Sequence, residues 1–321
     1  MTLGETVVVP SATFFDASAG GRLLLRGEDR CRFLHNFCTN DIEALAEGDT
    51  CEAFVTDMKG HVLGHVWVCA QPERLWLHTV GSSVDDLRGH LEKYIITEDV
   101  VIEDATASTS RAVVCGPQAE AAATSIVETL VGSIGLPVGR AVVDWIGCED
   151  VVLWIEVAGS EDLPLAAVAA GVPVGSPEAF ESLRIAALLP VVGIDITSEN
   201  FAQEVDRDRQ AISFSKGCYL GQETIARIES RGHVNQLLRG LAIDGSERPE
   251  VGAVIRSIGG DQGGRELGRV GSVAGVEHDS VEPGSAVALV VVRREASQPG
   301  TDVVVDTNVG PTAARIVSAN R

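Results

Sequence analysis

The last part of the chain consists of strands and turns alone, and this all-β tail places the strongest limit on the fold. From Leu237 onward, short runs rich in Val, Ile and Leu alternate with Gly, Pro, Asp and Ser, which is typical of antiparallel strands joined by tight turns. The expected strands cover residues 240–243, 253–257, 266–273, 286–293 and 302–305. Such a series predicts a small antiparallel β-barrel. The glycine-rich stretch 259–264 lies between two of these strands with no helix after it, so it indicates a hairpin loop rather than a phosphate-binding loop.

The N-terminal part of the chain mixes strands with helices. We expect strands at 21–27, 51–57, 61–69 and 74–80, and helices at 28–37 and 83–94. The turn at 57–60 predicts a hairpin between the second and third of these strands. His61 and His65 share one strand face with Leu63 and Trp67, but two histidines at this spacing make a metal-ligand pair only on a helix. We therefore predict no metal ligands in this chain.

The middle of the chain predicts a ferredoxin-like unit that begins after a polar seam at 105–110. Strands are expected at 111–115, 140–146 and 151–157, and helices at 117–131 and 163–170. This β-α-β-β-α order needs one more strand, and the short apolar run 172–174 is the candidate. A further helix begins at Ser176, a favourable N-cap residue that is followed by Pro177, and ends at Pro190. Together with the tail, these elements predict an α+β protein.

Composition limits the class of protein. The 321 residues carry a net charge of −21, which argues against a protein that coats nucleic acid, because phosphate binding needs a basic face. The longest apolar run, 286–292, is much shorter than the roughly 20 residues that cross a bilayer, and the first residues do not resemble a signal peptide. Seven widely spaced cysteines without a CxxC pair indicate free thiols. We expect a cytoplasmic protein, a monomer, with neither a membrane nor a direct nucleic-acid partner.

The segment 216–224 is the stretch with the most specialised chemistry. Cys218 follows Lys216 and Gly217, and it precedes Gly221 and an expected helix that ends at Arg231. A thiol close to an ammonium and just before a helix N-terminus has the setting that lowers a cysteine pKa. The plain alternative is that Cys218 is one more small, buried apolar side chain. The two flanking glycines favour an exposed turn over that alternative.

Several motifs together resemble the glycine-cleavage T-protein superfamily, and the cysteine segment is similar to its YgfZ branch. The motifs are residues 25–36, 39–41, 57–60, 183–196, 264–272 and, most specific of all, 216–223 with 226–227 and 231–232. The resemblance implies a three-lobed ring with a central channel for tetrahydrofolate or a one-carbon derivative. It divides the chain into a T-protein-like region at 1–235, with subdomains of about 1–105 and 106–235, and a C-terminal β-barrel at 236–321.

Departures from the superfamily patterns concern the chemistry of the channel. The T-protein places two acidic residues at the end of a strand, and here Gly64 and His65 occupy those positions, so no carboxylate orients a folate amine there. Ala202 and Ala186 replace residues that are usual in the YgfZ branch. Phe180 stands where that branch has a tryptophan associated with folate, and it keeps a ring for stacking without the indole N–H.

The resemblance implies roles for individual residues, each with a plain alternative. Cys218 is the candidate catalytic thiol, able to react or to bind iron transiently. The candidate cofactor-binding residues are Asp57, Lys59, Phe180, Lys216, Tyr219, Gln222 and Arg227. Asp57 and Lys59 can equally be turn residues, Lys216 a solvated lysine, and Tyr219 a core residue. Gln222 can cap helix donors, and Arg227 can pair with Glu223 one helical turn away.

These assignments predict a folate-binding accessory protein for iron–sulfur cluster assembly or repair that supports iron–sulfur enzymes, including tRNA-modifying ones. Its partners would be folate and iron–sulfur client proteins or assembly factors. The alternative is a tetrahydrofolate-dependent aminomethyltransferase or another one-carbon transferase, which the Gly64-His65 pair disfavours. A third possibility is a folate-binding module without chemistry, which would tolerate the loss of Cys218.

Overall fold

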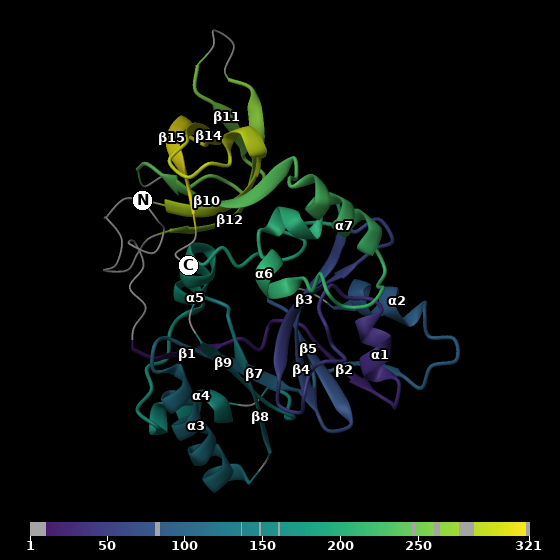
Figure 1. Cartoon of the computed structure of the whole chain (residues 1–321). Coiled ribbons are helices and arrows are strands. Elements are labelled where there is room, and N and C mark those ends of the chain that lie inside the picture. Colours follow the sequence, from purple (N-terminus) through teal and green to yellow (C-terminus); the bar gives the residue numbers. More distant parts are fainter. Residues whose placement is uncertain are drawn as a thin grey trace.

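The computed structural model shows three lobes arranged around a centre (Figure 1). It describes residues 11–80, 84–135, 137–147, 149–159, 161–245, 248–259, 264–275 and 286–318. A five-stranded sheet with two helices forms the lobe on the right of the view, a four-stranded sheet with two helices forms the lower lobe, and a β-barrel forms the upper lobe. Among the described helices, none is long and apolar enough to cross a membrane.

The first lobe is an antiparallel sheet with the strand order β3-β4-β5-β2-β6. Its strands are β2 (Arg22–Arg26), β3 (Thr50–Thr56), β4 (Val62–Gln71), β5 (Arg74–His78) and β6 (Val101–Asp104), and its helices are α1 (Arg30–His35) and α2 (Asp85–Glu92). Alternate residues of β4 face opposite sides of the sheet: Val66 and Val68 join the core under the helices, whereas Trp67 and Cys69 join the core that faces the second lobe. The expected strands, helices and hairpin of this region are confirmed.

The second lobe has the strand order β1-β7-β9-β8, covered by α3 and α4. Its elements are β1 (Thr13–Asp16), β7 (Ser110–Cys115), α3 (Ala119–Ile134), β8 (Val138–Val143), β9 (Asp150–Ile155) and α4 (Asp162–Ala169). The expected last strand at 172–174 is wrong, because β1 takes that place and pairs with β7 along its whole length. Val174 makes only a single bridge to Phe14, and Pro173 has no N–H to donate to a ladder. The division of the chain into domains stays a prediction.

The barrel closes through six antiparallel strands in the order β10-β13-β12-β11-β14-β15, with β15 paired back to β10. The strands are β10 (Gln236–Ile243), β11 (Val254–Ser257), β12 (Glu266–Gly275), β13 (Ala286–Arg293), β14 (Asp302–Thr307) and β15 (Gly310–Val317), with a short helix η3 (Arg294–Ala296). The predicted barrel is confirmed, although the pattern misses β15, which begins with Gly and Pro. The 259–264 loop does join two paired strands, β11 and β12, but residues 260–263 lie outside the described residues.

Four short helices follow the second lobe in the chain and precede the barrel. They are α5 (Pro177–Ala186), η2 (Ala202–Val205), α6 (Asp208–Ala211) and α7 (Gln222–Arg231). Two of them, α5 and α6, lie near the middle of the view (Figure 1). The predicted N-cap of α5 is confirmed, because the Ser176 hydroxyl accepts a hydrogen bond from the Ala179 N–H at 3.2 Å. Arg184 then joins α5 to the barrel by donating to Asp195 at 3.2 Å and to Ser272 of β12 at 2.6 Å.

Tryptophan side chains fill the contact between the two sheets. All four tryptophans of the chain are buried there, with Trp67 and Trp145 rings 5.3 Å apart and Trp76 and Trp154 rings 5.6 Å apart. Because aromatic side chains bury a large apolar area in a well-defined geometry, this contact holds the first two lobes in a set orientation. The orientation brings the start of β3 close to the end of β8, and a pocket opens between them.

Candidate functional site

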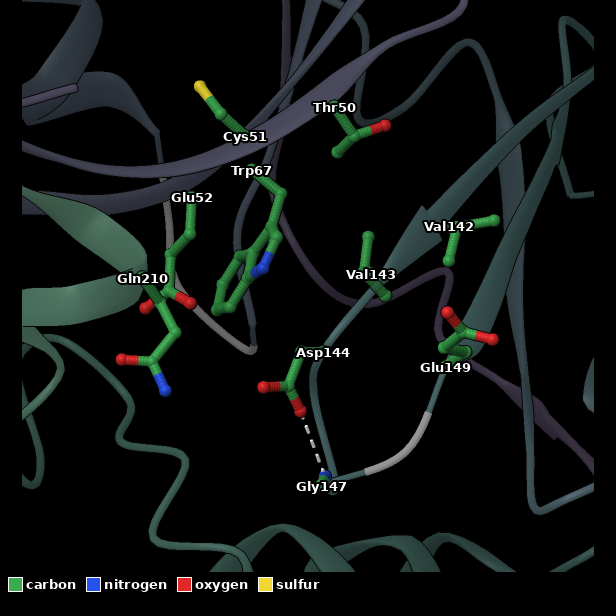
Figure 2. A pocket seen from close by; sticks show the side chains of 10 residues that line it. All are labelled: Thr50, Cys51, Glu52, Trp67, Val142, Val143, Asp144, Gly147, Glu149 and Gln210. Atoms are coloured by element: carbon green, nitrogen blue, oxygen red, sulfur yellow. Dashed lines mark hydrogen bonds between the residues drawn. The ribbon is translucent and has the colours of Figure 1, made fainter. Parts of the chain in front are cut away.

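The inter-sheet pocket has a volume of about 510 Å³ and opens where the two sheets meet α6 (Figure 2). Its walls come from β3 and β4, from the end of β8 and the turn after it, and from α6. The lining residues are Thr50, Cys51, Glu52, Trp67, Val142, Val143, Asp144, Gly147, Glu149 and Gln210. This volume is in the range of pockets that hold small organic ligands. The described lining residues combine an indole with carboxylates and a side-chain amide, and none of them carries a cationic side chain.

Glu52 connects this pocket to a buried cluster of charges. Its carboxylate receives two N–H groups of the Arg207 guanidinium, one at 2.6 Å, and the Nε2 atom of His65 lies 2.7 Å from the same carboxylate. Arg207 also donates to the carbonyl of Asp144 at 2.9 Å, so it joins α6 to both sheets. Burial by itself would raise the pKa of Glu52, but the Arg207 charge and the His65 hydrogen bond lower it to about 2. Glu52 is therefore ionised at neutral pH.

His65 occupies the strand position where the T-protein resemblance places an acidic residue. The structure shows the imidazole between the rings of Phe54 and Trp67, almost fully buried and bonded to Glu52. The carboxylate that does reach this place, that of Glu52, has both oxygens bonded to Arg207 or His65. The Glu52 carboxylate is therefore paired with Arg207 and His65 and is not free to bind a ligand in the pocket. The other histidine of that face, His61, has separate partners, because it lies 3.1 Å from Asp57 and stacks on Phe201.

Cys218 lies on an irregular segment between α6 and α7 and is exposed. The other described cysteines are buried or half-buried, and Cys148 lies outside the described residues. Two residues after the thiol, the Leu220 N–H donates to the carbonyl of Asn36 at 2.9 Å, and the Leu220 carbonyl accepts from the Thr56 hydroxyl at 2.7 Å. The segment is therefore held between the end of α1 and the β3–β4 hairpin.

Lys216 holds the same segment from the other side of the thiol. Its ammonium donates to three backbone carbonyls, those of His35 at 2.6 Å and of Cys38 and Asn40 at 2.8 Å each. A lysine has three N–H donors, so all of them are used. From the sequence, Lys216 was expected to be solvated, to contact a ligand or to lower the pKa of the thiol. In the structure it is a buried anchor for the segment, only 7% exposed, with its ammonium over the ring of Tyr219.

The hairpin turn meets the cysteine segment, although about 160 residues separate them in the sequence. Gly221 has φ +88°, and a side chain there would come within 2.5 Å of the Asp57 carbonyl, so the contact requires glycine on that side. The Asp57 carboxylate accepts from the N–H groups of Lys59 and His61 at 2.8 and 2.9 Å. Burial would raise the pKa of Asp57, but these backbone bonds lower it. The Asp57 side chain thus stabilises the hairpin turn, which was the alternative to cofactor binding. Lys59 is exposed beside it.

The remaining predicted cofactor residues have different surroundings. Tyr219 is buried in the core beside α7, and burial raises the pKa of its phenol. Gln222 is the half-buried first residue of α7, and Arg227 is exposed on that helix without an ion pair to Glu223 among the described residues. Phe180 is set apart from these residues on α5, where its ring lies 5.5 Å from Phe15 and 6.3 Å from Trp145.

None of the predicted cofactor residues lines the inter-sheet pocket. Trp67 and His65 were accessible to sequence reasoning through their shared strand face, and His65 also through its place in the T-protein motif. Asp144, Glu149 and Gln210 carried no such signal, because the first two lie between β8 and β9 and the third lies on the short helix α6, and all three reach the pocket only through the packing of the lobes. The cysteine segment and the pocket are thus two candidate sites, one predicted and one found in the structure.

Comparison with known proteins places these sites in a family context. Residues 5–142 match the model of the GCVT N-terminal domain. A chloroplastic "putative transferase" of Arabidopsis thaliana is 28% identical over 316 residues, which cover 94% of this chain and 70% of that protein. The tRNA-modifying protein YgfZ of Yersinia enterocolitica is 28% identical over 236 residues, which cover 71% of this chain and 70% of that protein.

The fold matches a solved structure along nearly the whole chain. The glycine cleavage system aminomethyltransferase T from Bartonella henselae superposes with a TM-score of 0.77 at 19% identity, over 98% of this chain and 87% of that one. At this identity the match establishes the fold and not the activity. The chain thus has the fold of the glycine cleavage T-protein, its residues 5–142 match the GCVT N-terminal domain, and its sequence is similar to that of YgfZ proteins.

Proposed function

We propose that the protein is a folate-binding accessory factor that supports the assembly or repair of iron–sulfur clusters in client enzymes, with Cys218 as its working thiol. The observation that carries the proposal is the state of this thiol: it is exposed, and its segment is tied to the first lobe on both sides. The relatives named tRNA-modifying protein YgfZ support a link to RNA-modifying clients. The cluster would be cargo, because the described residues contain no group of three or more side chains that could hold a metal ion.

The inter-sheet pocket suits the ring system of a folate. A pterin has an apolar ring face and an amidine-like N–H edge that pairs with carboxylates. Trp67 is almost fully buried against His65 and Trp145 and gives the pocket an apolar base, and Asp144 and Glu149 supply carboxylates on the opposite wall (Figure 2). Since no cation lines the pocket, the anionic glutamate tail of the folate would extend toward solvent. Tetrahydrofolate, when bound, would supply a carrier for a one-carbon unit.

The charge cluster under the pocket favours an accessory role over aminomethyl transfer. A transferase of this fold needs a carboxylate that is free to orient the folate amine. Here His65 stands at that position, and the Glu52 carboxylate is committed to Arg207. Transfer remains the alternative, and it has a direct assay: turnover of an aminomethylated lipoyl carrier in the presence of tetrahydrofolate would establish it.

Folate binding can be measured by titration with the air-stable 5-formyl derivative of tetrahydrofolate, followed by tryptophan fluorescence because Trp67 lines the pocket. We expect Asp144→Asn to weaken binding by about tenfold or more, since a hydrogen bond to a charged group contributes about 1.5–3 kcal/mol. The matched control is Asp302→Asn, an exposed aspartate of the barrel, which should bind like the wild type. Equal affinities for all three proteins would exclude this pocket as the folate site.

The role of the thiol can be tested in a host that lacks its own copy of the protein. Cys218→Ala should fail to restore iron–sulfur enzyme activity, whereas the half-buried Cys31→Ala should restore it. Because Cys218 is exposed, its replacement should leave stability within about 0.5 kcal/mol of the wild type, so a loss of function reports on chemistry. Full restoration by Cys218→Ala would remove the thiol from the proposal. Val142→Trp should obstruct the pocket. If Val142→Trp abolished function and Cys218→Ala did not, the protein would be a binding module without chemistry.

A further inference from the structure

Asn40 joins the two walls of the inter-sheet pocket. Its side-chain amide donates to the carbonyl of Glu52 at 2.7 Å and to the carbonyl of Gln210 at 2.9 Å. Glu52 belongs to β3 and Gln210 to α6, and both residues line the pocket. The amide oxygen accepts from the Asp41 N–H at 2.9 Å, so the orientation of the amide is set by the chain itself. Asn40 therefore follows any change in the separation of these two walls.

The same residue supports the cysteine segment. The carbonyl of Asn40 accepts from the Lys216 ammonium at 2.8 Å, and Lys216 lies two residues before the exposed thiol. The neighbouring Thr39 reinforces the joint, because its hydroxyl donates to Ala211 at the end of α6 and its carbonyl accepts from the Ser213 N–H at 2.9 Å. The short loop at residues 39–40 therefore contacts both candidate sites. The Asn40 side chain binds the pocket walls, and the backbone carbonyl of Asn40 accepts a hydrogen bond from the cysteine segment.

Burial makes this connection stiff. A buried ammonium cannot exchange its carbonyl partners for water without a cost of several kcal/mol. Lys216 is only 7% exposed, and this burial lowers the pKa of its ammonium. When the loop at Asn40 shifts, Lys216 must shift with it, and the segment that carries Cys218 must follow.

We propose that Asn40 and Lys216 are positioning residues that couple occupancy of the inter-sheet pocket to the exposure and reactivity of Cys218. The inference rests on the proposed binding of folate in that pocket and adds how this binding regulates the thiol. A ligand held between Thr50 of β3 and Gln210 of α6 biases the distance between these two elements, and the Asn40 amide transfers that bias to the segment. Coupling between two sites in a protein typically changes an affinity or an accessibility by about fivefold or more.

The test measures the rate of iodoacetamide alkylation at Cys218 by mass spectrometry, with and without saturating 5-formyltetrahydrofolate. Cys31 in the same sample is the internal control, since it is half-buried on α1. We expect the ligand to change the Cys218 rate by about fivefold or more and the Cys31 rate by less than about twofold. Asn40→Ala and Lys216→Met should each abolish the ligand effect, and Asn308→Ala, on an exposed turn of the barrel, should preserve it.

Each outcome decides between mechanisms. An undiminished ligand effect in folded Asn40→Ala and Lys216→Met proteins would show that the ligand shields the thiol directly, and would overturn the coupling. Binding of the ligand without any change at Cys218 would overturn the coupling and leave the proposed function intact, whereas absence of binding would overturn both. If the two variants do not fold, hydrogen exchange of the Leu220 amide in the wild type decides, because that amide donates to Asn36. Exchange that is unchanged by bound ligand would refute the inference.

Discussion

Removal of the Arg207 guanidinium tests how the charge cluster under the pocket is held together. In the wild type, the pKa of Glu52 is lowered from 4.5 to about 2, because Arg207 and His65 outweigh the effect of burial. This shift corresponds to about 3 kcal/mol of stability at neutral pH. Replacing one partner of a buried ion pair costs about 3–5 kcal/mol by itself, because the other charge is left buried. We therefore expect Arg207→Met to lower the free energy of unfolding by about 3–5 kcal/mol at pH 7.

The pH dependence gives this prediction its sign. In the wild type, Glu52 has a folded pKa below its unfolded value, so its contribution is complete above pH 4.5 and is lost as the pH falls toward 2. In Arg207→Met, burial without the guanidinium raises the pKa of Glu52, and the folded state then binds a proton more tightly than the unfolded state. The variant should therefore gain stability as the pH is lowered from 7 toward 5, where the wild type does not.

Urea denaturation followed by tryptophan fluorescence measures both effects, since all four tryptophans lie between the two sheets that Arg207 helps to join. The control is Arg315→Met, which removes an exposed pair with Asp302 and should cost little stability. Adding Glu52→Gln to Arg207→Met should remove the pH dependence and recover part of the stability. Equal losses in Arg207→Met and Arg315→Met would refute the reasoning. So would an Arg207→Met protein that loses stability on acidification as the wild type does.

Two further substitutions test local features that hold the candidate sites. Gly221→Ala should destabilise the protein by more than Gly232→Ala: both positions have positive φ, which costs about 1 kcal/mol for alanine, but only at Gly221 would the new methyl meet the Asp57 carbonyl. Thermal denaturation compares the two, and equal losses would contradict the close contact. Ser176→Ala should lower stability by about 1 kcal/mol because α5 loses its N-cap acceptor, whereas Ser176→Asp should keep it; a loss as large in the aspartate variant would exclude capping as the cause.

Elements with strong local patterns were predictable. The hairpin around 57–60, the capped start of α5 and five strands of the barrel follow from periodicity and turn residues, which act over a few neighbouring positions. The sixth strand, β15, begins with Gly310 and Pro311, residues that ordinarily end strands, so its pairing with β10 decides its structure. The run 172–174 had the local character of a strand, yet β1 competes for the same sheet edge and pairs with more residues.

The residues of the two candidate sites also fall into those that the sequence predicts and those that only the tertiary structure places. Residue types and spacing were enough to single out Cys218, and the T-protein resemblance was enough to predict that Gly64 and His65 stand where that protein has acidic residues, because a motif is a property of the chain itself. Folding alone decided that the Lys216 ammonium is buried among three carbonyls, and that Glu52, His65 and Arg207 meet beside a pocket. The direction in which a polar side chain is buried depends on the lobes that pack around it. Those lobes are brought together by contacts between residues far apart in the sequence, which no local pattern encodes.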